Sequence, residues 1–145
     1  MTNVSLAQSY LAKARVRLTI LPILHEAAAY SDVVRESQEV VELALKGMLR
    51  QAGVEPPHWH DVGGLLQEHA SRFRALTPAD IERAAAASAW LRKEREFAFY
   101  GDIDFVPTER YDAAVATRAI DDARTVVALA ERIIVLPSGS SQVRP

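Results

Sequence analysis

The chain has 145 residues, of which 49% are hydrophobic and 25% are charged, and its formal net charge is −2. This length suits one globular domain with a substantial apolar core, and the slight negative charge gives no overall attraction to nucleic acid, although a local basic patch stays open. The chain contains no cysteine, which excludes disulfides, thiolate nucleophiles and cysteine-based metal sites.

The N-terminal sequence lacks the basic-then-apolar layout of a signal peptide, and no apolar run approaches the length of a membrane span. A cytoplasmic protein is therefore expected. Apolar residues recur with a helical period almost throughout, and no stretch alternates with period two for long enough to form a sheet. The expected fold class is all-α.

The first predicted helix runs from residue 5 to about residue 28. Its start, Ser5-Leu6-Ala7-Gln8, has the form of a capping box, in which the serine oxygen accepts the backbone N–H three residues on. Pro22 removes one backbone donor inside this helix, so a kink or break is expected near residues 20–22.

The second predicted helix, from about residue 31 to residue 52, has the clearest apolar stripe, and Gly53 is well placed to end it. The stripe consists of Val33, Val40, Val41, Ala44, Leu45, Met48 and Leu49. After a stiff turn over residues 53–57, a shorter helix is expected from about residue 61 to residue 73.

The fourth predicted helix starts at Thr77-Pro78-Ala79-Asp80. These residues supply a threonine cap, a proline at the first helical position and an acid facing the positive end of the helix dipole. This helix should continue to about Tyr100, where Gly101 stops it.

The fifth predicted helix is opened by Pro107-Thr108-Glu109 and ended by Pro137. Its apolar side consists of Tyr111, Val115, Ala119, Val126, Ala130, Ile133 and Ile134. Together the five helices predict an antiparallel up-and-down bundle of four long helices plus a shorter one over residues 1–136. Residues 137–145 are expected to form a flexible tail.

Two segments taken together resemble the HEPN superfamily (higher eukaryotes and prokaryotes nucleotide-binding domain). One is SQEVVELALKGML at residues 37–49, followed by Gly53, Pro56-Pro57 and His60-Asp61. The other is FYGD at residues 99–102, followed by the Pro-x-Glu that opens the last helix. The resemblance covers nearly the whole chain apart from the tail. It implies a helical bundle that is usually dimeric and is often encoded beside a small nucleotidyltransferase, with which it forms a toxin–antitoxin pair.

Catalytic members of that superfamily are metal-independent ribonucleases with an Arg-x4-6-His motif near the end of a late helix. The histidine moves protons and the arginine binds the phosphate. In this chain Arg95 followed by four residues leads to Tyr100, and no histidine occurs after His69. A tyrosine normally titrates near pH ~10, so its phenol is a poor proton acceptor at neutral pH. The motif histidine is absent, and whether the chain is an enzyme stays open.

The resemblance implies an RNA- or nucleotide-binding site around Arg92, Arg95, Phe99, Tyr100 and Asp102. On an ideal helix the first three of these residues fall within about 60° of arc, so that two guanidinium groups and an aromatic ring could hold a phosphate. The alternative is that the arginines form salt bridges with acids on neighbouring helices while the aromatic residues pack in the core or in a dimer seam. No cofactor is expected.

Other polar residues give weaker signals. His58, His60 and His69 lack the accompanying cysteines or the i, i+4 spacing of a metal site, so no metal is expected. Glu94 shares a side of its helix with small residues, and a carboxylate there needs a partner, for which an arginine or Lys46 is the expected type.

Three functions stay open. The first is a dimeric RNA- or nucleotide-binding component of a nucleotidyltransferase-linked, toxin–antitoxin-type complex. The second is a metal-independent ribonuclease toxin that has rebuilt its site with Tyr100, and the third is a purely structural scaffold. A short nucleotidyltransferase gene beside this one would favour the first over a solitary scaffold.

Overall fold

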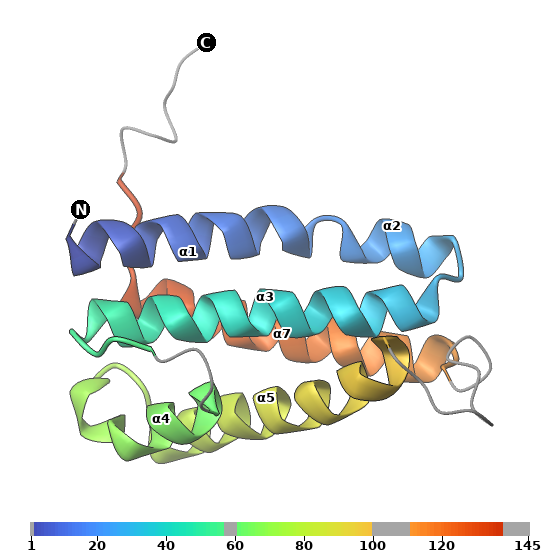
Figure 1. Ribbon diagram of the computed structural model, residues 1–145. Coiled ribbons are helices and arrows are strands. Elements are labelled where there is room, and N and C mark those ends of the chain that lie inside the picture. The colour runs from blue at the N-terminus through green and yellow to red at the C-terminus, as the bar shows by residue number, and fades with distance from the viewer. Residues whose placement is uncertain (1, 57–60, 100–110, 138–145) are drawn as a thin grey trace, which may run out of the picture.

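The computed structural model describes residues 2–56, 61–99 and 111–137, and this part of the chain is all-helical (Figure 1). The all-α prediction is confirmed. The long helices are α1 (Asn3–Leu18), α3 (Tyr30–Gln51), α5 (Pro78–Phe99) and α7 (Ala113–Ile133). The short elements are α2 (Leu21–Glu26), α4 (Val62–Glu68) and the 3₁₀ turn η1 (Ala70–Arg72). Residues 138–145, most of the expected tail, lie outside the described residues.

The first helix begins earlier than predicted, because Thr2 and not Ser5 is its N-cap. The Thr2 hydroxyl oxygen accepts the backbone N–H of Ser5 at 3.0 Å, and the Ser5 hydroxyl oxygen accepts the backbone N–H of Thr2 at 3.0 Å. The expected break is present, since α1 ends at Leu18 and α2 starts at Leu21. Pro22 lies in the first turn of α2, where its missing N–H would have no helical partner in any case.

The first predicted helix was expected to continue to about residue 28, and this end was placed too late. Ala28 has a φ of 59°, in the left-handed region, and α2 has already ended at Glu26. The backbone N–H of Ala29 donates to the carbonyl oxygen of Leu24 at 2.9 Å, which is the bond that closes a helix through a left-handed residue. The chain therefore turns sharply here and enters α3.

Helix α3 is the centre of the fold and packs against α1, α5 and α7. Figure 1 shows it between α1 and α5. Val41, Leu45 and Met48 of its predicted stripe are buried. Gly47 lets α1 approach closely, because an added Cβ would lie 3.2 Å from the carbonyl oxygen of Ala7. As predicted, Gly53 follows the end of α3 with a φ of 80°.

The helix predicted over residues 61–73 is shorter in the structure. Asp61 is the N-cap of α4, and its carboxylate accepts the backbone N–H of Gly63 at 3.1 Å. Helix α4 ends at Glu68, and η1 then brings Phe73 into the core.

The start of α5 is as predicted. The backbone N–H of Asp80 donates to Thr77 Oγ1 at 3.1 Å, and the backbone N–H of Thr77 donates to Asp80 Oδ2 at 2.9 Å. The bond from the Thr77 N–H is the largest cause that lowers the pKa of Asp80 below its ordinary value, with smaller contributions from the Thr77 hydroxyl and Arg132.

Helix α7 begins at Ala113. Asp112 has an extended backbone, and its carboxylate caps the helix by accepting the backbone N–H of Val115 at 2.9 Å. Tyr111, which was expected on the helix, precedes it, and the predicted opening at residues 107–109 lies outside the described residues. The buried Tyr111 donates its hydroxyl to the carbonyl oxygen of Glu94 at 2.7 Å and so ties the start of α7 to α5.

Candidate functional site

The predicted site lies at the C-terminal end of α5, where Arg92 and Arg95 are one turn apart. Arg92 forms an ion pair with Asp61, the cap of α4, at 3.1 Å. Arg95 reaches α3 instead, where it lies 2.9 Å from Glu39 Oε2 and 2.7 Å from Gln38 Oε1. The two guanidinium groups therefore contact different neighbouring elements.

The remaining predicted site residues fall at the edge of the described chain. The side chain of Phe99 and the whole of Tyr100 and Asp102 lie outside the described residues. Arg92 and Arg95 therefore form salt bridges with acids of neighbouring elements, as the alternative interpretation of these arginines expected. The placement of the aromatic rings stays a prediction.

Both ion pairs are at least partly exposed to solvent. The side chains of Arg92 and Asp61 are 42% and 54% exposed, and those of Arg95 and Glu39 are 33% and 37% exposed. Exposed ion pairs of this kind contribute only about 0–1 kcal/mol. An anion that displaces either carboxylate therefore forgoes only the small free energy of such an ion pair.

Glu94 is only 8% exposed, as expected for its position among small residues. Its backbone carbonyl accepts the Tyr111 hydroxyl, which places it beside the start of α7. Lys46, one of the partners expected for this carboxylate, lies 3.7 Å from Glu42.

Sequence reasoning did not single out Arg118, which stacks on Trp90 with its Cζ 3.8 Å from the ring centroid. The two residues line a cleft of about 480 Å³ between α5 and α7, together with Glu94, Tyr111, Ala114 and Val115. A stack between two helices leaves no spacing signal in the sequence, because the fold alone brings its members together.

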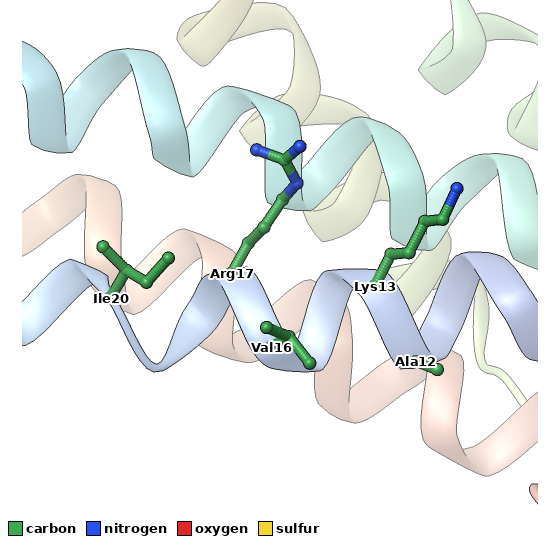
Figure 2. A pocket seen from close by; sticks show the side chains of 5 residues that line it. All are labelled: Ala12, Lys13, Val16, Arg17 and Ile20. Carbon is green, nitrogen blue, oxygen red and sulfur yellow. The ribbon is translucent and has the colours of Figure 1, made fainter.

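Another hollow, of about 570 Å³, lies over the outer surface of α1 and is lined by Ala12, Lys13, Val16, Arg17 and Ile20 (Figure 2). Figure 2 shows Lys13 and Arg17 extending toward α3. Arg17 is 2.6 Å from Glu36, and the hydrogen bond to this carboxylate raises the pKa of Arg17. Val16 is 64% exposed, so the surface is largely apolar and suits a protein contact better than a nucleotide.

The described residues contain no group of three or more acidic or histidine side chains that could hold a metal ion. His58 and His60 lie outside them, and His69 Nε2 is 3.3 Å from Glu68. The Nε2 atom of His25 is 3.1 Å from Thr117 Oγ1, so this half-buried imidazole links α2 to α7.

Across the described ranges, no helix is both long enough and apolar enough to span a membrane. A family model described as HEPN domain matches residues 7–133, from within α1 to the end of α7. The match confirms the resemblance drawn from residues 37–49 and 99–102. No curated protein matches the chain.

Proposed function

Since the chain belongs to the HEPN domain family, we propose that it is a dimeric RNA- or nucleotide-binding protein. It would act with a nucleotidyltransferase-type partner in a toxin–antitoxin-type complex. Its long helices would form the antiparallel up-and-down bundle expected of such a protein. The proposed binding surface lies around Arg92, Arg95, Phe99, Tyr100 and Asp102.

The observation that carries this proposal is the pair of partly exposed arginines one turn apart on α5. Arginine stays charged at every physiological pH, and its planar fork of N–H donors matches the oxygens of a phosphate. Because Asp61 is exposed and Glu39 is partly exposed, both arginines can exchange a carboxylate for a phosphate.

The proposal is for binding without efficient cleavage. A metal-independent ribonuclease needs a group that accepts a proton near neutral pH, and histidine is the side chain suited to that task. The chain has no histidine after His69, so neither α5 nor α7 carries an imidazole. Tyr100 takes the motif position but is a poor base at neutral pH.

The test is a metal-free cleavage assay on the purified protein, with RNA binding measured in parallel. We expect measurable RNA binding, weaker binding by Arg95→Ala, and a cleavage signal that Tyr100→Phe leaves almost unchanged. Robust turnover abolished by Tyr100→Phe would establish the ribonuclease alternative. Absence of both binding and cleavage in the folded wild-type protein would leave only the scaffold function.

A further inference from the structure

We propose that the cleft between α5 and α7 binds one nucleotide unit, a base with its phosphate, either free or as part of an RNA strand. The inference rests on the proposed function. It uses Trp90 and Arg118, whereas the surface proposed above uses Arg92 and Arg95, whose contacts are with α4 and α3. The cleft between α5 and α7 and the surface around Arg92 and Arg95 can therefore be tested separately.

Arg118 is placed to hold a phosphate. Its guanidinium group stacks over Trp90 at 3.8 Å, and stacking occupies the face of the group while its N–H donors point outward along the edge. Within the described part of the chain, Arg118 forms no ion pair with a carboxylate, in contrast to Arg92 and Arg95. Its charge is not neutralised by a carboxylate of that part, and its side chain is exposed.

The cleft has the size and lining of a small-ligand site. Its volume of about 480 Å³ lies within the range of roughly 300–1,000 Å³ found for such sites. Ala114 and Val115 contribute apolar surface, and the Tyr111 hydroxyl bond to α5 fixes one wall. Aromatic rings and stacked arginines are the platforms on which nucleobases rest, because every base has a π-face.

The charge pattern of the cleft sets the orientation of the ligand. Trp90, Ala114 and Val115 line the cleft with aromatic and apolar surface, which suits an uncharged group better than a phosphate. Arg118 is exposed and attracts the phosphate to the rim. An uncharged base then occupies the interior, where it can stack and make apolar contacts.

Tryptophan fluorescence can report on this cleft directly. The chain has two tryptophans, so Trp59→Phe leaves Trp90 as the single reporter. Titration with AMP should change the fluorescence in a saturable way, and adenosine and inorganic phosphate should each bind at least about 10-fold more weakly. A short oligoadenylate then distinguishes an RNA strand from a free nucleotide as the ligand. If the oligoadenylate binds more tightly than AMP, the cleft binds RNA; if it binds no more tightly than AMP, the cleft binds the free nucleotide.

In this background Arg118→Gln should raise the Kd for AMP at least about 10-fold. The matched control is Arg124→Gln, which removes another exposed arginine of α7 that also lacks an ion pair in the described chain, and it should change the Kd less than about 2-fold. Circular dichroism checks the fold of each variant, and calorimetry checks binding independently of fluorescence.

An AMP affinity that Arg118→Gln leaves unchanged, or no AMP binding by calorimetry, overturns the inference. If RNA binding is nevertheless lost in Arg95→Ala, the proposed function stands and only the cleft is refuted. If neither AMP nor RNA binds to the folded protein, both proposals fail.

Discussion

Arg95 is held by Glu39 and Gln38 of α3 at distances of 2.9 and 2.7 Å, so any phosphate that binds it competes with Glu39. A hydrogen bond to a charged group contributes about 1.5–3 kcal/mol, and an exposed ion pair contributes about 0–1 kcal/mol. Arg95→Ala should therefore weaken RNA or nucleotide binding by about 0.5–3 kcal/mol. Glu39→Gln should strengthen binding or leave it unchanged, because it removes the competitor.

Fluorescence anisotropy with a labelled single-stranded RNA measures both changes. If Glu39→Gln weakens binding as much as Arg95→Ala does, Glu39 orients the arginine for its ligand and the competition argument is wrong.

Leu45 tests the core of the fold. It is fully buried on α3, which packs against α1, α5 and α7. Leu45→Ala should lower the free energy of unfolding by roughly 2–5 kcal/mol, because a close-packed site collapses only partly around the missing atoms. Chemical denaturation measures this, and a loss below about half a kcal/mol would place the stripe of α3 on the surface.

Among the turns between elements, Ala28 has a backbone conformation that glycine adopts more easily. Its φ of 59° costs a residue with a Cβ about 1–2 kcal/mol, whereas glycine lacks this penalty but gives the unfolded chain more freedom, worth about 0.4–1 kcal/mol. Ala28→Gly should therefore raise the free energy of unfolding by about 0–1.6 kcal/mol.

Ala27 is the matched control for this substitution. It is also exposed, but its φ is −79° and offers glycine no such gain. Ala27→Gly should be neutral or destabilising in urea denaturation. If Ala28→Gly and Ala27→Gly destabilise the protein equally, residue 28 does not adopt the left-handed conformation.

The helix ends that sequence could predict are those specified by local chemistry. Gly53 and the Thr77–Asp80 pair satisfy backbone groups within their own turn, and Pro22 marks the break between α1 and α2. The cap of α1 was misassigned because Ser5 fits the pattern both as a cap and as the third helical residue after Thr2. Ala28 could not be foreseen, since alanine carries no preference for a left-handed turn.

At the scale of the whole molecule, the sequence located the arginines of α5 but not their contacts. Asp61 and Glu39 come from elements distant in sequence, and which acid each arginine meets depends on how α3 and α4 pack around α5. The contact of Arg118 with Trp90 likewise depends on how α7 packs against α5. Helix periodicity gives the side of a helix on which a residue lies, whereas the element that covers that side is set by the tertiary fold.

The molecule also exposes apolar surface of the kind that an interface covers. Val16 and Ile23 are 64% and 66% exposed on the outer side of α1 and α2. We predict a homodimer that buries at least about 1,000 Å² in total, the lower range for a specific interface. Light scattering at micromolar concentration should give twice the mass of the chain, and a monomer under these conditions would contradict the prediction.

The most direct measurement for the central claim is the affinity of a single-stranded RNA for the wild-type protein and for the Arg92→Ala/Arg95→Ala double variant. The matched control is Arg15→Ala/Arg35→Ala, which removes the same charge from exposed ion pairs on α1 and α3. We predict that the first pair of substitutions raises the Kd at least about 10-fold, or about 1.4 kcal/mol, and that the control pair raises it much less. Equal affinities for the two double variants, with both folded, would contradict an RNA-binding role for the arginines of α5.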